Sequence, residues 1–172
     1  YALNQRLPDD IVIVSSKEVP LDWHPRYQDE ILKTYEYHIY NAPVQNPLKR
    51  RYSAFVSFPM NVEKMREGAA YLLGEHDFVS FCNVRTSVED TVRTVKELMI
   101  EQEGPDITIR ITGNGFLYNM VRIIAGTLIR VGRGFYEPTK VKEILEARER
   151  TQAGVTAPPE GLTLVCIEYD GS

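Results

Sequence analysis

The chain has 172 residues, of which 43% are hydrophobic and 26% charged, a balance typical of a globular domain rather than a disordered one. Its net charge of -4 and its pI near 5.5 exclude a global basic field, so any nucleic-acid partner must bind a local patch. Two cysteines far apart in the sequence, Cys82 and Cys166, argue against a disulfide scaffold and favour a reducing compartment. The composition predicts a single soluble, cytoplasmic domain, residues 1–172.

Three strands are predicted in the first third of the chain. Residues 11–14 form a β-branched run between polar segments, which is typical of a buried strand. Residues 31–40 alternate with a period of two, which places Lys33, Tyr35 and Tyr37 on one face. Residues 52–58 alternate in the same way and are expected to pair with residues 31–40.

A helix is predicted after Asn61, a good N-cap, and is expected to end at Gly74. A second helix is predicted over residues 116–131. It is apolar over about 240° of its surface and leaves a narrow polar strip. The first helix is expected to bury Val62, Met65, Ala69, Leu72 and Leu73, and the polar strip of the second consists of Asn119, Arg122, Gly126 and Arg130.

Further elements follow the same reasoning. Residues 92–101 and 107–112 are predicted to form an antiparallel pair, Thr139 is expected to cap a third helix, and residues 162–169 are predicted to form the last strand. Paired strands with helices between them predict an α+β fold, with a mainly antiparallel sheet and helices packed on one face.

Most motifs associated with chemistry are weak or missing in this sequence. The two Gly-x-Gly pieces, at residues 113–115 and 132–134, lack the third glycine or lysine of a phosphate loop and are typical of turns. The three histidines have no metal-ligand spacing, so no metal site is predicted. Cys82 and Cys166 are interpreted as small core residues.

Two positions leave a functional and a structural interpretation open. Arg122 either faces solvent at the edge of its helix or is buried and needs a carboxylate partner, and helix geometry alone favours the solvated edge. Tyr35 shares a strand face with a lysine and precedes the basic run at residues 49–51, a mixture that can stack a base and hold a phosphate. It could equally be a strand aromatic that packs against a helix.

Five blocks of sequence resemble the tRNA pseudouridine synthase A family, and together they extend over nearly the whole chain. The blocks are Asp22-Trp23-His24-Pro25-Arg26-Tyr27 with Lys33-Thr34-Tyr35-Glu36-Tyr37, then residues 73–81, residues 113–122 and residues 156–162. The resemblance implies an isomerase that converts uridine to pseudouridine in the anticodon stem-loop of tRNA, without a metal or cofactor. It also implies a cytoplasmic homodimer that has no contact with a membrane.

The family's nucleophile is an aspartate in a Gly-Arg-Thr-Asp-Ala-Gly block, and this sequence contains no such block. The chain is therefore expected to be the C-terminal part of such an enzyme, inactive alone, with residues 1–45 adjoining an N-terminal half. The opening on Tyr1 agrees with this expectation. Arg122 is expected to become disordered or to pair with another anion when that aspartate is missing.

The resemblance assigns roles residue by residue. Tyr35 matches the tyrosine that stacks on the target base, and Arg122 matches the basic partner of the catalytic aspartate. Both roles are chemically reasonable, because an extruded base needs an aromatic face and an ionised carboxylate in a dry pocket needs a cation. Leu162 and Leu164 would line the base pocket. The resemblance also makes Arg26 and Arg93 expected phosphate or pocket contacts, and the basic residues that accompany Tyr35 in the sequence add Lys33, Lys49, Arg50 and Arg51 as expected RNA contacts.

Two other functions remain open on the sequence alone. The same fold could serve as a non-catalytic RNA-binding or dimerisation module, in which case salt-dependent tRNA binding would occur without isomerisation. A small-molecule enzyme unrelated to RNA is supported only by the absence of a global positive charge.

Overall fold

A computed structural model describes residues 2–25, 31–83 and 90–169 of the chain. Its elements, in chain order, are β1 (Ile31–Asn41), β2 (Ala54–Val56), α1 (Val62–Ala70), β3 (Gly74–Asp77), β4 (Val92–Glu103), β5 (Asp106–Gly113), α2 (Met120–Gly132), α3 (Lys140–Ala147) and β6 (Leu162–Tyr169). Short 3₁₀ turns occur at Val79–Phe81, Arg150–Gln152 and Pro159–Gly161. The predicted order of strands and helices is confirmed from β1 onward, apart from the additional strand β3.

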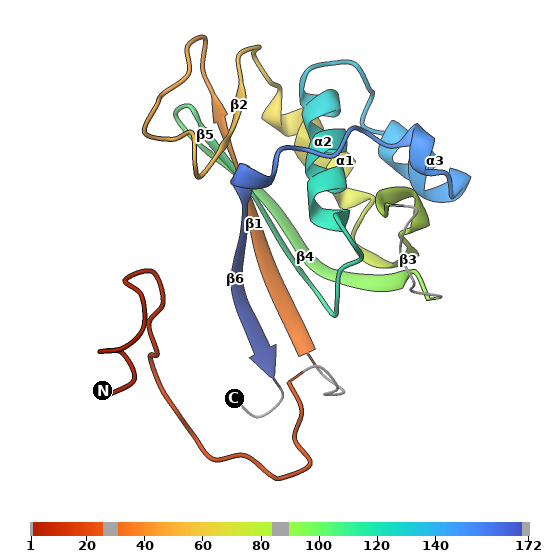
Figure 1. The fold of residues 1–172 in the computed structure, drawn as a ribbon. Helices are drawn as coiled ribbons and strands as arrows, with labels where there is room; N and C mark the ends of the chain where they lie inside the picture. The colour runs from red at the N-terminus through yellow and green to blue at the C-terminus, as the bar shows by residue number, and fades with distance from the viewer. Residues whose placement is uncertain (1, 26–30, 84–89, 170–172) are drawn as a thin grey trace.

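The strands form one sheet in the order β2-β1-β5-β4-β3, with β6 also paired to β1. Among the described strands only β1 and β2 pair in parallel, and the helices gather beside one face of the sheet (Figure 1). Because β6 pairs with the first part of β1 and β2 with its end, these two strands share one edge of β1. The predicted α+β class, with a mainly antiparallel sheet covered by helices on one face, is confirmed.

The predicted alternation of β1 and β5 accounts for the core. Tyr37 and Ile39 of β1 lie opposite Ile109 and Ile107 of β5, and all four side chains are at most 1% exposed. The opposite face of the pair carries polar partners such as Thr34 and Thr112, whose hydroxyls lie 2.8 Å apart. Period-two patterning therefore places the core on the face that the helices cover.

Helix α2 is the central element of that core, and ten of its residues are buried, as its apolar circumference predicts. It begins at Met120 rather than at Phe116, because Asn119 adopts a left-handed backbone (φ 61°) that interrupts helical geometry. Helix α1 begins as predicted, with the Asn61 side chain accepting a hydrogen bond from the Lys64 amide. Thr139, in contrast, makes no side-chain cap for α3.

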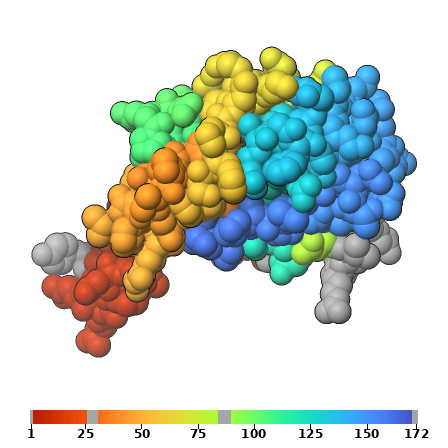
Figure 2. All heavy atoms as spheres, turned by 90° about the horizontal axis from the view of Figure 1, so that it is seen from above, coloured from red at the N-terminus to blue at the C-terminus, as the bar shows by residue number. Residues whose placement is uncertain are grey.

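The prediction of a buried strand at residues 11–14 is wrong. Val14 is 93% exposed and Ile11 52%, and residues 2–25 lie outside the body formed by the sheet and helices (Figures 1 and 2). Around residues 11–14 the contacts are local, since the Asn4 side chain exchanges two hydrogen bonds with the backbone of Ile13, while Trp23 nearer the sheet meets the Tyr169 ring of β6 edge-to-face at 5.3 Å. A β-branched run needs a neighbouring strand to pair with, and no described strand runs beside this one.

Two smaller expectations also need correction. The strand expected at residues 52–58 is limited to Ala54–Val56, since Tyr52 and Phe58 on either side are exposed. Leu73, expected in the core, is 42% exposed because α1 ends at Ala70 and the chain turns into β3. Within the described part of the chain, no helix is both long and apolar enough to cross a membrane.

Candidate active site

A cavity of ≈ 230 Å³ lies where β1, the start of α2 and the start of β6 meet. Three predicted site residues, Tyr35, Arg122 and Leu162, line it together, although they are far apart in the sequence. The remaining lining residues come from the turn before α2 and from its first two residues, namely Phe116, Leu117, Tyr118, Asn119, Met120 and Val121. The cavity thus has an aromatic and aliphatic wall and a single guanidinium.

Tyr35 is held in place by the two strands that flank β1, namely β5 and β6, and by one aromatic side chain. Across the sheet it lies opposite Ile111 on one side and Leu164 on the other, and its ring meets Phe116 edge-to-face at a centroid distance of 5.2 Å. These contacts leave Tyr35 half-buried, with an aromatic surface on the cavity. Leu164, also expected to line the base pocket, lies directly opposite Tyr35 in β6 and is 46% exposed, but it is not among the residues that line the cavity.

Arg122 is ordered by neutral oxygens rather than by a carboxylate. Its Nε donates to the Ala157 carbonyl at 2.7 Å, and one terminal nitrogen donates to the Asn119 side-chain oxygen at 3.0 Å. Among residues 2–25, 31–83 and 90–169, Arg122 has no partner for an ion pair. Its second terminal nitrogen makes no hydrogen bond to these residues. The expectation that Arg122 would be disordered is therefore wrong, because these two hydrogen bonds are enough to fix the side chain, and the expected pairing with another anion stays a prediction. The interpretation of a solvated edge is also inadequate, since the side chain is half-buried.

The turn before α2 places both Asn119 and Phe116. The left-handed backbone of Asn119 turns the chain from the β5 turn into α2, a conformation that asparagine tolerates better than most residues. The Asn119 backbone carbonyl accepts the Ile123 amide at 3.0 Å, while its side chain is directed to Arg122. One residue therefore starts the helix and orients the guanidinium.

The loop at residues 153–158 completes the support of Arg122. It lies directly on α2, where the Ala157 amide donates to the Arg122 carbonyl at 3.1 Å and the Gly154 amide donates to the Thr127 hydroxyl at 2.9 Å. A Cβ on Gly126 would lie 1.9 Å from the Val155 carbonyl oxygen. The glycine is thus required for the loop to approach the helix closely enough to reach Arg122.

Tyr37 fixes the same loop from the sheet. Its ring is fully buried, its hydroxyl donates to the Pro158 carbonyl at 2.8 Å, and a Cβ on Gly161 would meet the ring at 2.8 Å. Burial raises the pKa of the Tyr37 phenol well above its usual range, and the nearby Glu160 carboxylate raises it further, against a smaller opposing effect of Arg122. Tyr37 therefore remains a neutral hydrogen-bond donor at any physiological pH.

Replacing Tyr37 with phenylalanine is expected to lower the free energy of unfolding by about 1 kcal/mol at pH 7, since one hydrogen bond is removed. The pKa of Tyr37 is raised in the folded protein, so the phenol loses its proton more easily in the unfolded chain, where its pKa is near 10. The full contribution of Tyr37 to the free energy of unfolding is therefore present below about pH 10 and is lost as the pH rises above that value. The difference between wild type and variant should therefore shrink above pH 10. Urea unfolding at pH 7 and pH 10.5 measures both effects, and a constant difference would contradict this assignment.

The basic residues expected to contact RNA do not form one group. Lys33 shares the face of Tyr35 two residues away on β1. Arg93 of β4 lies against Gly115, where a Cβ would be 3.4 Å from its Nε, one residue before Phe116. Arg26 lies outside the described residues.

The run Lys49-Arg50-Arg51 lies at the opposite end of β1. Lys49 pairs with Asp106 at 2.9 Å, and Asp106 lies opposite Tyr40. Since a strand rises about 3.3 Å per residue, this places the run roughly 17 Å from Tyr35 along β1. The structure therefore does not bring these three residues to the cavity.

Sequence reasoning missed several residues of the site as participants. Phe116, Asn119 and Leu117 line the cavity, and the block at residues 113–122 that carries the family resemblance contains all three. Ala157 acts through its backbone carbonyl and amide, and Tyr37 through its hydroxyl, which donates to the Pro158 carbonyl. No local sequence pattern predicts these contacts. Among the described residues, no group of His, Cys, Asp and Glu is arranged to hold a metal ion.

Comparison with known proteins gives consistent matches. A family model described as tRNA pseudouridine synthase matches residues 69–170. The tRNA pseudouridine synthase A of Brevibacillus brevis is 48% identical over 169 residues, covering 98% of this chain and 69% of that protein. The protein of the same name from Bacillus subtilis is 46% identical over 170 residues, covering 99% of this chain and 68% of that protein. The similarity thus extends over nearly all of the segments that line the cavity.

Proposed function

This chain belongs to the tRNA pseudouridine synthase family, and we propose that the cavity between Tyr35, Arg122 and Leu162 holds the uridine that is isomerised. The observation that carries the proposal is the convergence of these residues, which come from β1, α2 and the start of β6, on one cavity of ≈ 230 Å³. No sequence pattern requires residues 35, 122 and 162 to meet.

The walls of the cavity suit an unstacked base. Removing a base from its stack costs a few kcal/mol, which an enzyme recovers by stacking it on an aromatic face and enclosing it in apolar side chains. Tyr35, braced edge-to-face by Phe116, offers such a face, and Leu162 at the start of the adjoining strand offers apolar surface. Tyr35 thus acts as the stacking platform.

Arg122 supplies the only cation among the described residues that line this cavity. Its guanidinium is already oriented by Ala157 and Asn119 and keeps N–H donors for a carboxylate. A paired guanidinium stabilises the ionised, nucleophilic form of an aspartate in a dry site. The sequence contains no Gly-Arg-Thr-Asp block, so we propose that the nucleophile lies outside these 172 residues.

The reaction has a direct readout. The bond between N1 of uracil and C1′ of the ribose breaks, the base rotates, and a bond from C5 to C1′ forms while the C5 hydrogen leaves as a proton and N1 takes up a proton. Tritium at C5 of uridine is therefore released to solvent once per turnover. We expect release from tRNA with the complete gene product and none with the 172-residue chain alone. Release by the chain alone would place the nucleophile on one of its own residues, and tRNA binding without release by either protein would favour a non-catalytic RNA-binding module.

Three further features belong to this proposal. The target uridines lie in the anticodon stem-loop, the enzyme acts as a homodimer, and its location is the cytoplasm, where it meets tRNA. The family resemblance supports all three. Fingerprinting the modified nucleotides tests the first, and sedimentation of the complete gene product tests the second.

Replacing Tyr35 with leucine is expected to lower kcat/KM for tRNA by about 5- to 150-fold, since base–aromatic stacking contributes about 1–3 kcal/mol. Tyr35→Phe is the matched control, because it keeps the ring and its contact with Phe116 while removing only the hydroxyl. Steady-state tritium release compares the two variants. Equal losses in both would contradict a stacking role and point to the hydroxyl instead.

A further inference from the structure

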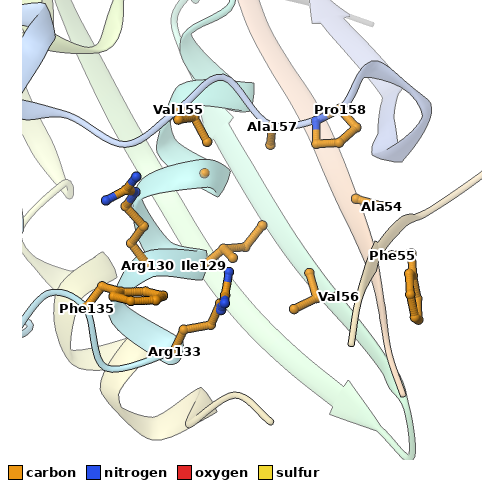
Figure 3. A pocket seen from close by; sticks show the side chains of 11 residues that line it. Ala54, Phe55, Val56, Ile129, Arg130, Arg133, Phe135, Val155, Ala157 and Pro158 are labelled. Atoms are coloured by element: carbon orange, nitrogen blue, oxygen red, sulfur yellow. The ribbon is translucent and has the colours of Figure 1, made fainter. Parts of the chain in front are cut away.

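A second cavity, of ≈ 320 Å³, adjoins the candidate active site and carries two arginines that the proposed chemistry does not use. Three segments line it: β2, the second half of α2 with the turn after it, and the loop at residues 155–158. Arg130 and Arg133 rise from the same side of this cavity, with Ala54, Phe55 and Val56 across from them (Figure 3). Ile129, Val56 and Ala54 give it an apolar floor.

Both guanidiniums are held in place without using their hydrogen-bond donors. The central carbon of Arg133 lies 4.5 Å from the Phe58 ring centroid and 4.8 Å from that of Phe135, and Arg130 lies 5.3 Å from the Tyr136 ring. Within the described ranges, neither side chain forms an ion pair or a hydrogen bond. Cation–π contacts occupy the faces of a guanidinium and leave its N–H edges available.

The backbone at this end of α2 does not satisfy these donors. The Arg130 carbonyl already accepts the Phe135 and Tyr136 amides, and the Ile129 carbonyl accepts the Arg133 amide. Two fixed guanidiniums with unused N–H groups beside one cavity form a binding site for an anion with several acceptor oxygens. Phosphate suits this geometry best, because guanidinium edges bind phosphate oxygens in pairs.

The remaining lining favours a nucleotide over an isolated anion. Phe135 is 61% exposed at the rim and can stack against a base, while the apolar floor can accommodate a ribose or base edge. The site is linked to the candidate active site through Ala157, which lines this cavity and accepts a hydrogen bond from Arg122 with its carbonyl. Arg130 follows Arg122 by eight residues on α2, about 12 Å along the helix axis.

We infer that the cavity between Arg130, Arg133 and Phe135 binds a second, unpaired nucleotide of the RNA substrate, with its phosphate on the two guanidiniums. The inference rests on the proposed function, since it takes RNA as the partner. It explains how a chain with a net charge of -4 holds a polyanion beside its active site. The distance of about 12 Å along α2 allows one RNA strand to occupy both cavities.

The test compares two charge-matched double variants of the complete gene product. Arg130→Gln/Arg133→Gln removes the two guanidiniums that would hold the phosphate. The control, Lys142→Gln/Arg148→Gln, removes two positive charges from α3 and the residue after it. Lys142 already pairs with Glu146, and Arg148 with Asp77. We expect the first variant to bind tRNA at least about tenfold more weakly, with a log–log salt slope shallower by about 0.7–0.9 for each RNA phosphate that is no longer neutralised. The control should match wild type. Phe135→Leu should weaken binding at least about fivefold, since it removes base stacking, without altering the salt slope.

Each alternative outcome contradicts the inference in a recognisable way. Equal tRNA affinity in wild type and both double variants overturns the second nucleotide site but leaves the proposed function intact. Absence of tRNA binding by wild type contradicts both. A change in oligomeric state in the Arg130/Arg133 variant, at unchanged tRNA affinity, identifies a protein interface instead. Binding of inorganic phosphate by wild type and not by the variant, again at unchanged tRNA affinity, identifies a free-anion site.

Discussion

Substitution of Arg122 by alanine or lysine should reduce kcat for pseudouridine formation at least about a hundredfold, the scale seen when one preorganised electrostatic donor is removed from an active site. Lysine keeps the charge but has one nitrogen in place of the Nε and terminal nitrogen that donate separately to the Ala157 carbonyl and the Asn119 side chain and so orient the guanidinium. Single-turnover tritium release with saturating tRNA isolates this effect from binding.

Arg66→Lys is the matched control for Arg122→Lys. Arg66 also donates its Nε to a backbone carbonyl, that of Ile100 at 2.8 Å, but it lies on α1 and lines neither of the two cavities described above. Its kcat should equal that of wild type. Full activity in Arg122→Lys would show that charge alone suffices, and full activity in Arg122→Ala would remove this residue from the mechanism.

The second large effect is expected from one methyl group on α2. Gly126→Ala places a Cβ 1.9 Å from the Val155 carbonyl oxygen and 3.1 Å from its carbon, and a backbone atom cannot move aside as a flexible side chain can. The loop must shift away from the helix, so the free energy of unfolding should fall by about 3 kcal/mol. The same loop carries the Ala157 carbonyl that accepts the hydrogen bond from Arg122. We therefore expect the guanidinium to be oriented less well and kcat to fall as well.

Gly68→Ala in α1 is the matched control. It makes the same change in helix propensity as Gly126→Ala but without a close contact between the new Cβ and backbone atoms. Both glycines lie inside helices and are buried, but the nearest atom to a Cβ on Gly68 is a Val141 methyl at 3.2 Å. This variant gains helix propensity at a modest steric cost and should stay within about 1 kcal/mol of wild type. Urea unfolding of the two variants measures the difference, and equal stabilities would contradict the close approach of the loop to Gly126.

The elements that the sequence predicts well are those with a strong period or a clear capping residue. β1 and β5 alternate cleanly, α2 is apolar around most of its surface, and Asn61 marks the start of α1. The sequence does not predict β3, because its polar run Gly-Glu-His-Asp has no strand pattern and depends on pairing with β4. Residues 11–14 have a strand pattern but no described strand to pair with.

The candidate site shows the same division between local and distant information. Family resemblance, not periodicity, identifies Tyr35, Arg122 and Leu162, and helix geometry alone favours a solvated Arg122. Only the fold shows that Lys49 lies at the far end of β1, paired with Asp106. The same holds for the loop at residues 153–158, because its position depends on contacts with Tyr37, Gly126 and Thr127, which lie 27 or more residues away.

The central claim is that the cavity beside Tyr35 receives the target uridine, and photo-crosslinking tests it most directly. A tRNA with 4-thiouridine at the modified position is irradiated with the complete gene product, and the adduct is mapped by mass spectrometry. The account predicts crosslinks to Tyr35 or Phe116, which decrease in Tyr35→Leu and when unlabelled tRNA competes. Crosslinks confined to residues outside the cavity, with Tyr35 and Phe116 unmodified, would contradict it.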